Sequence, residues 1–247
     1  MKQTRLMMGM PITIEIADAG VSADVFDQAY AYLVYVDETF SPFKETSEVS
    51  RINRGELDPA QASDDLRLIL GLADFTRQQT DGYFDVMHEG VFNPSGLVKG
   101  WAIWNAAQVV RTAGCRNFYV DAGGDIQAYG LNERGTPWLV GIRNPFEPQG
   151  IVKRLALSNC GIATSGLYQR GRHIYNPHNA GDELNQVVSM TVIGPNVYEA
   201  DRFATAAFAM GPQGINFIES LDGLEGYSID SDRRGTMTSG FAQVVAA

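Results

Sequence analysis

Apolar residues recur at steps of three and four positions in three segments, which predicts three amphipathic helices. Their apolar positions are Phe26, Ala29, Leu33, Val36 and Phe40; then Leu66, Ile69, Leu70 and Ala73; then Ile103, Ala107 and Val110. Ser22 and Ser63 stand where N-caps are expected for the first two helices. The third helix is expected to begin near Lys99, and Gly114 is suited to end it.

Other segments alternate between apolar and polar residues or are rich in β-branched residues, which predicts strands. We expect strands at 8–16, 117–122, 138–142, 152–157 and 187–193, helices at 198–210 and 213–221, and a hairpin at 227–241. Helices and strands interleave without regular βαβ repetition. The sequence therefore predicts one α+β domain over residues 1–247, with a mixed or antiparallel sheet packed by helices.

Composition narrows the possible partners. The chain has 19 Lys and Arg against 29 Asp and Glu, a formal net charge of −10. An acidic surface repels nucleic acid and anionic membranes. No apolar run is long enough to span a bilayer, and the first residues lack the apolar core of a signal peptide, so we expect a cytoplasmic protein without a membrane span. Cys115, Cys160 and the histidines lack zinc-binding spacing.

Asp201 and Thr205 are the first candidates for chemistry. They are four positions apart in the predicted helix at 198–210, so they share one face, which is otherwise apolar. Burying a carboxylate and a hydroxyl without partners is unfavourable, and oxygen ligands of this kind suit magnesium. The alternative is a carboxylate near the helix N-terminus beside a threonine bonded to its own backbone.

Four further segments carry candidates. Asn93–Gly100 leads into the third helix, where backbone N–H groups favour phosphate and Lys99 could neutralise it, although the loop is not a Walker A motif. Asp81–Asp85 holds two aromatic residues that suit a flavin or adenine ring, as does Phe43. His173 could act as a base. The alternatives are a helix-entry turn with a surface lysine, aromatic core residues and a structural histidine.

Taken in order, these segments resemble the ApbE family of FAD:protein FMN transferases. The matching segments are Met8; Phe40–Ser41; Ser47–Asn53; Asp81–Asp85; Ser95–Gly100; Gly123–Asp125; Ala163–Gly166; His173–Ile174 with Asn176–Pro177; and Ala200–Asp201 with Ala204–Thr205. The resemblance implies an ApbE-like, T-fold-like domain. It also implies magnesium-dependent transfer of the FMN part of FAD to a Ser or Thr hydroxyl of an acceptor protein, with release of AMP.

The resemblance also implies residue roles. Asp201 and Thr205, with the main chain of Gly96, match the magnesium ligands. Lys99 and His173 match groups at the reacting centre. The positions that match nucleotide contacts are Met8, Phe43, Tyr83, Phe84, Asp85, Asn93 and Ile174.

The chain departs from the family pattern at four positions. Asn93 and Asn176 stand where the family usually has aspartate, Phe43 replaces a common tyrosine, and Trp104 replaces an aspartate. These changes remove negative charge and polar contacts around the nucleotide. Two alternatives to a transferase therefore remain: an FAD pyrophosphatase that yields FMN and AMP, and a non-catalytic FAD-binding protein.

Overall fold

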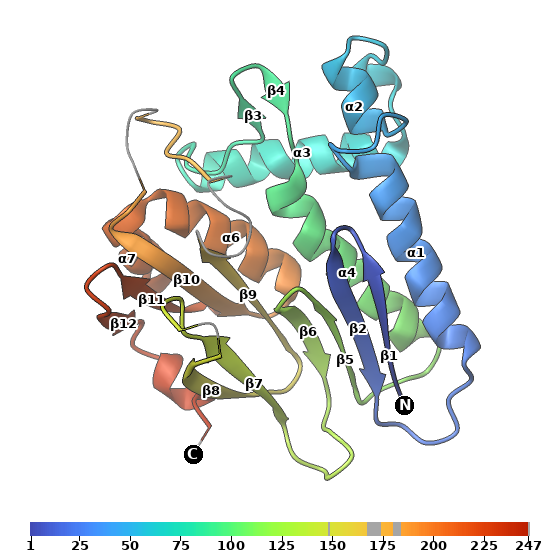
Figure 1. Cartoon of the computed structure of the whole chain (residues 1–247), viewed down its shortest axis with the longest axis vertical. Helices are drawn as coiled ribbons and strands as arrows, with labels where there is room; N and C mark the ends of the chain where they lie inside the picture. Colours follow the sequence, from blue (N-terminus) through green and yellow to red (C-terminus); the bar gives the residue numbers. More distant parts are fainter. Residues whose placement is uncertain (148, 167–173, 180–183, 247) are drawn as a thin grey trace.

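A computed structural model describes residues 1–147, 149–166, 174–179 and 184–246 (Figure 1). Within these residues eight strands form one fully antiparallel sheet in the order β1-β2-β5-β6-β9-β10-β11-β12. The strands are β1 (Lys2–Met7), β2 (Met10–Ile16), β5 (Phe118–Ala122), β6 (Asp125–Tyr129), β9 (Cys160–Gly166), β10 (Val187–Gly194), β11 (Glu225–Asp230) and β12 (Gly235–Met237). The predicted α+β fold with an antiparallel sheet is confirmed.

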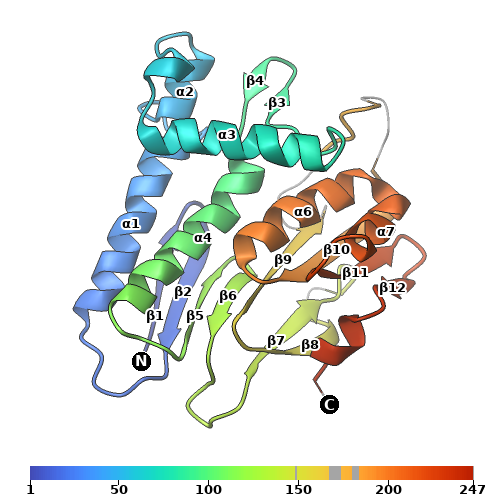
Figure 2. The same cartoon turned by 180° about the vertical axis from the view of Figure 1, so that it is seen from behind.

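Helices cover one face of this sheet, as the view from behind shows (Figure 2). The helices are α1 (Asp24–Phe40), α2 (Glu48–Asn53), α3 (Asp64–Gln79), α4 (Ser95–Thr112), α6 (Val197–Ala209) and α7 (Gly214–Glu219). Helices α4 and α6 lie on the sheet, and α3 crosses above their ends (Figure 2). Short 3-10 turns occur at Pro59–Gln61, Gly211–Gln213 and Phe241–Val244.

Two separate hairpins complete the described fold. One, β7 (Trp138–Arg143) with β8 (Ile151–Leu157), lies in front of the sheet face that the helices leave free (Figure 1). The other, β3 (Met87–His88) with β4 (Val91–Phe92), projects beside α3. None of the helices in the described ranges has both the length and the apolar composition needed to cross a bilayer.

Three apolar clusters hold these layers together. The largest packs α1 and α4 on β2 and β5, with buried residues such as Phe26, Ile14 and Phe118. The second packs α6 and α7 on β10. The third fills the space between the β7–β8 hairpin and the opposite face of the sheet, and includes Trp138. Burial of these side chains is the main term that favours folding.

The structure corrects three local predictions. The expected strand at 8–16 begins only at Met10, because Met8 and Gly9 have positive φ angles of 52° and 72° and form the turn after β1. The first helix begins at Asp24 with Ala23 as its N-cap, so Ser22 lies one position too early. The third helix begins at Ser95, which places Lys99 in its second turn.

Other local predictions are confirmed. The Ser63 side chain accepts a hydrogen bond from the Leu66 amide and caps α3. Gly114 follows α4 with φ at 94°. The tail forms the expected hairpin, as β11 and β12. Strands β6 and β9 were not predicted; β9 is largely buried and rich in small residues, so it shows no alternation.

Candidate functional site

The close approach of α4 and α6 builds the centre of the site. Gly100 lacks a side chain where α4 faces Asp201; a β-carbon there would stand 2.7 Å from the Asp201 β-carbon and 2.9 Å from the Val197 carbonyl oxygen. The Gly100 amide donates a hydrogen bond of 2.8 Å to Asp201 Oδ2. Asp201 is only 2% exposed. The glycine therefore allows a helix-borne carboxylate to be buried against a neighbouring helix.

Lys99 joins this carboxylate to a second one. Its ammonium group pairs with Asp125 and lies 3.3 Å from Asp201 Oδ1. Asp125 is 1% exposed, begins β6 and accepts a hydrogen bond of 3.0 Å from the Thr164 amide of β9. Two carboxylates thus share one ammonium group, and the cluster keeps a net negative charge when all three are ionised.

The electrostatics of the cluster follow from this arrangement. Burial raises the pKa of the Asp201 carboxyl to about 6; Lys99 opposes the rise, and Asp125 adds to it. A buried carboxylate with incomplete compensation favours the approach of a cation. The cluster is therefore suited to a positively charged ligand, although no other acidic or histidine side chain joins it among the described residues.

Hydroxyl oxygens of Thr205 and Ser165 lie near the end of β9, on the side of α6 that carries Asp201. Thr205 lies one turn after Asp201 on α6, and its hydroxyl is 3.5 Å from the Ser165 hydroxyl at the end of β9. Gly96, in the first turn of α4, faces the Thr205 side chain; a β-carbon there would lie 3.4 Å from Thr205 Cγ2. The structure thus brings together Gly96, Asp201 and Thr205, the three residues that the resemblance links to magnesium. A carboxylate and hydroxyl oxygens are ligands that fit this ion.

A cavity of about 260 Å³ lies on one side of the α4 N-terminus. Its lining includes the predicted residues Tyr83, Phe84, Asp85, Asn93 and Ile174, together with Gly96 and Thr205. The Asn93 side chain accepts hydrogen bonds from the amide and hydroxyl of Ser95, at 3.1 and 2.6 Å, and so stabilises the first turn of α4.

A second cavity, of about 340 Å³, lies on the other side. It is lined by Met8, Met10, Phe43 and Lys99, among others, and Ser95 borders both cavities. Phe43 is 90% exposed, so its ring is available to a ligand rather than part of the core. The two cavities therefore share Ser95 in the first turn of α4, and Lys99 lines the second of them.

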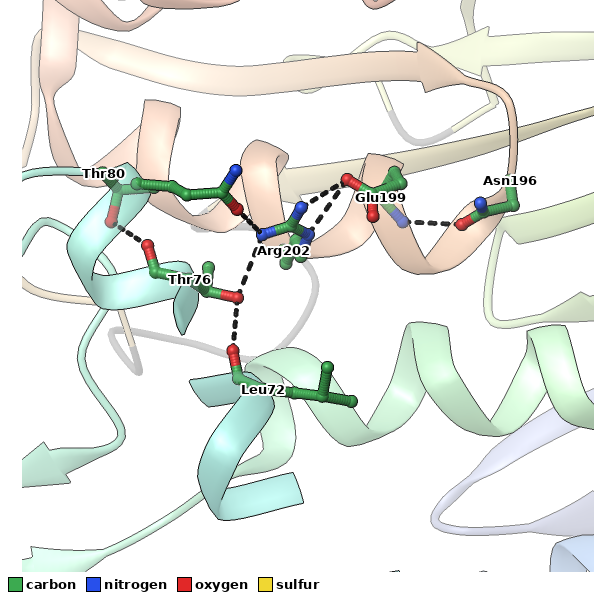
Figure 3. Close-up of polar contacts among 7 residues, drawn as sticks. Leu72, Thr76, Thr80, Asn196, Glu199 and Arg202 are labelled. Atoms are coloured by element: carbon green, nitrogen blue, oxygen red, sulfur yellow. Dashed lines mark hydrogen bonds and ion pairs between the residues drawn. The ribbon is translucent and has the colours of Figure 1, made fainter. Parts of the chain in front are cut away.

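Arg202 links helix α6 to helix α3 through side-chain contacts (Figure 3). It is 4% exposed, and its guanidinium group donates to Glu199 on α6 and to Thr76 and Gln79 on α3. The Thr80 hydroxyl continues this network, because it donates to the Thr76 carbonyl and accepts from the Phe84 amide. The network thus ties α6 to the segment that carries Phe84 into the first cavity.

Sequence reasoning assigned no role to Arg202 or Asp125. The segment Gly123–Asp125, which matches the family pattern, was the one indication from the sequence that Asp125 lies near the site. His173, the predicted base, lies outside the described residues. Its neighbour Ile174 lines the first cavity, and the His178 ring approaches the Asp81 carbonyl at 2.7 Å and the Tyr83 ring at 4.5 Å between centroids.

Comparison with known sequences identifies similar proteins. A sequence model of the ApbE family matches residues 8–95 and 89–228. The FAD:protein FMN transferase of Klebsiella pneumoniae (strain 342) is 29% identical over 153 residues, which cover 58% of this chain and 44% of that protein. The one from Vibrio cholerae is 34% identical over 128 residues, 48% of this chain and 38% of that protein. The matched region thus spans less than half of these curated relatives.

Solved structures share the fold over nearly the whole chain. The flavin transferase ApbE from Vibrio cholerae has a TM-score of 0.86 at 22% identity, covering 99% of this chain and 98% of that one. The ApbE protein from Thermotoga maritima has a TM-score of 0.88 at 18% identity, covering 100% and 99%. At these identities the likeness concerns the fold.

Proposed function

Because the chain belongs to the ApbE family, we propose that it transfers the FMN part of FAD to a Ser or Thr hydroxyl of another protein and releases AMP. The names of the curated relatives support transfer of FMN from FAD to a protein. The observation that carries the proposal for this chain is the buried cluster of Lys99, Asp125 and Asp201, whose Lys99 lines one of two cavities that both border Ser95.

The two cavities suit the two halves of FAD. Each half of the dinucleotide ends in a flat ring system, and a pyrophosphate joins them. Tyr83 and Phe84 line one cavity, and Met8 and Phe43 line the other. A pyrophosphate that spans them passes the N-terminus of α4, where backbone amides favour phosphate and Lys99 adds positive charge.

The residues present also fit magnesium. Asp201, Thr205 and Gly96 would hold the ion. When bound, it would supply positive charge to the pyrophosphate, the usual contribution of a metal in phosphoryl transfer. The incomplete compensation of the Asp201 and Asp125 carboxylates by Lys99 supports this assignment.

The remaining chemistry is a substitution at phosphorus. The acceptor oxygen forms a bond to the phosphorus on the FMN side, the bond from that phosphorus to the bridging oxygen breaks, and AMP leaves with that oxygen. The acceptor hydroxyl loses its proton, for which His173 is the proposed base. Lys99 and the α4 amides bind the phosphate oxygens, so positioning and charge stabilisation account for most of the acceleration.

The deciding experiment incubates the protein with FAD, magnesium and the acceptor proteins of a cell extract. We expect AMP release together with a protein band that keeps flavin fluorescence after denaturation, and loss of both when EDTA is added. AMP with free FMN and no fluorescent band would instead identify a pyrophosphatase. No AMP under any condition would identify a binding protein and overturn the transferase.

A further inference from the structure

The buried cluster contains a carboxylate, Asp125, that is not among the proposed magnesium ligands. Asp125 is 1% exposed and begins β6, whereas Lys99 lies on α4 and Asp201 on α6. In Figure 2 both helices lie over the sheet that contains β6. Burying a charge is costly unless a partner compensates it. The chemistry of Asp125 is therefore tied to its partner, Lys99.

The sheet fixes the position of Asp125. Its Oδ1 accepts a hydrogen bond of 3.0 Å from the Thr164 amide on β9, the strand that pairs with β6. The preceding turn is fixed as well, because the Gly124 amide donates to Asp121 Oδ1 at 2.8 Å and Gly124 has a φ angle of 103°, which suits glycine. The carboxylate is thus held by strands, while the other two members of the cluster belong to helices.

Lys99 faces one particular oxygen of Asp201. Its ammonium group pairs with Asp125 and lies 3.3 Å from Asp201 Oδ1. The other oxygen, Oδ2, accepts the hydrogen bond from the Gly100 amide at 2.8 Å. Oδ1 is therefore the oxygen of Asp201 that is more available to a cation. A metal ion that binds there competes with the Lys99 ammonium group for the same atom.

The second carboxylate decides this competition. Asp201 is 2% exposed, so water screens the repulsion between an ammonium group and a divalent cation only weakly. An ammonium group that paired with Asp201 alone would neutralise it and oppose the metal. Because Asp125 offers a fixed partner, Lys99 can leave Asp201 Oδ1 and still compensate a buried charge. Lys99 also lines the second cavity, so it can contact a phosphate from that position.

We infer, on the basis of the proposed function, that Asp125 is a positioning residue, which holds the Lys99 ammonium group away from Asp201 Oδ1 so that this oxygen can bind magnesium. No covalent bond changes in this step. Asp201 exchanges its ion pair with Lys99 for the divalent cation, and Lys99 keeps its ion pair with Asp125. The positive charge of Lys99 thus stays beside the pyrophosphate without reducing the affinity for the metal.

A double-mutant cycle with magnesium as the sole ligand tests this role. Calorimetry near pH 8, where carboxylates are ionised, measures the magnesium affinity of the nucleotide-free protein. In Asp125→Asn the amide oxygen can still accept from Thr164, and the amide nitrogen then faces Lys99 and directs it to Asp201. We expect the magnesium affinity to fall about tenfold.

The same change in a Lys99→Met background distinguishes positioning from simple charge. There the competing ammonium group is gone, so Asp125→Asn should alter the magnesium affinity by less than about twofold. Equal weakening in both backgrounds would mean that Asp125 acts only through its own negative charge, and would overturn the role. Lys99→Met alone should bind magnesium at least as tightly as the native protein, and weaker binding would overturn the competition.

Asp121→Asn is the matched control. It removes the same charge four positions earlier, from a carboxylate that lines a different cavity from Lys99, and its oxygen can still accept from the Gly124 amide. We expect an unchanged magnesium affinity; a loss as large as that of Asp125→Asn would overturn the role, as would a native protein that binds no magnesium. The titration needs no turnover, so AMP release tests the transferase separately.

Discussion

Gly100 and Asp201 lie so close that a β-carbon on Gly100 would stand 2.7 Å from the Asp201 β-carbon. Gly100→Ala must therefore push α6 from α4 or turn the carboxylate away from Lys99. We expect magnesium-dependent AMP release to fall at least about tenfold, since a small misplacement at a reacting centre has large effects. Gly71→Ala on α3, where no atom lies within 4 Å, is the control. It should leave the activity unchanged and slightly raise the free energy of unfolding.

Asp201→Asn should separate function from stability. The Asn side-chain oxygen can still accept the hydrogen bond from the Gly100 amide. The change removes one of the two buried carboxylates that share the Lys99 ammonium group. We expect activity to fall about a hundredfold or more, while the free energy of unfolding stays equal or rises, because the remaining Lys99–Asp125 pair is balanced. Urea unfolding and AMP release measured on one preparation check both parts. Lower stability with full activity would contradict the metal assignment.

Lys99→Met should weaken FAD and ADP to a similar extent, because both carry a pyrophosphate and the change removes its positive partner. The loss should be smaller for FMN, which has a single phosphate. Calorimetry with the three ligands measures the difference. Equal affinity for FMN and FAD in the native enzyme, with no effect of the change, would contradict the placement of the pyrophosphate beside α4.

Arg202→Met should loosen the connection between α6 and α3. The change leaves Glu199, Thr76 and Gln79 without their shared donor, so we expect the free energy of unfolding to fall by about 3 kcal/mol. Arg67→Met, at an exposed pair with Asp64, should change it by less than about 1 kcal/mol. FAD affinity measured by fluorescence should fall in the first variant only, since the network continues to the Phe84 amide.

Acid should weaken one contact far from the site. Burial of the Asp18 carboxylate would raise its pKa, but hydrogen bonds from the Asn117 amide and side chain and from the Arg116 amide outweigh it and lower the pKa. The stabilisation is present above the ordinary aspartate pKa and is lost as pH falls through the lowered one. Asp18→Asn should therefore reduce the free energy of unfolding at pH 7, by about 1–2 kcal/mol, and change it less near pH 3.

Sequence patterns predicted those elements whose burial is one-sided. The apolar stripe of α1 and the alternation of β2 follow from one face packing on the core, so both were found within a few residues. Strand β9 is buried along nearly its whole length and consists mostly of small residues, so no period marks it. The start of α4 was missed because the Asn93 side chain, rather than a residue next to Lys99, stabilises its first turn.

Some residues of the site could likewise be predicted from the sequence, and others could not. Asp201 and Thr205 stand out because polar side chains on an apolar helix need a partner. Asp125 and Arg202 become visible only when distant segments meet, since the partners of Asp125 are Lys99 and Thr164 and those of Arg202 include Thr76. No local pattern encodes such pairings. The proposed base, His173, stays a prediction.

The hydrogen bond between Gly100 and Asp201 joins residues that are 101 positions apart in the chain. Such a contact can form only after a long loop has closed, and contacts of this kind slow folding. Until α6 packs against α4, Asp201 cannot lie beside the ammonium group of Lys99. During synthesis most of the polypeptide, including α6, must therefore leave the ribosome before the cluster of Lys99, Asp125 and Asp201 can assemble. A chain truncated before α6 therefore cannot assemble the cluster of Lys99, Asp125 and Asp201.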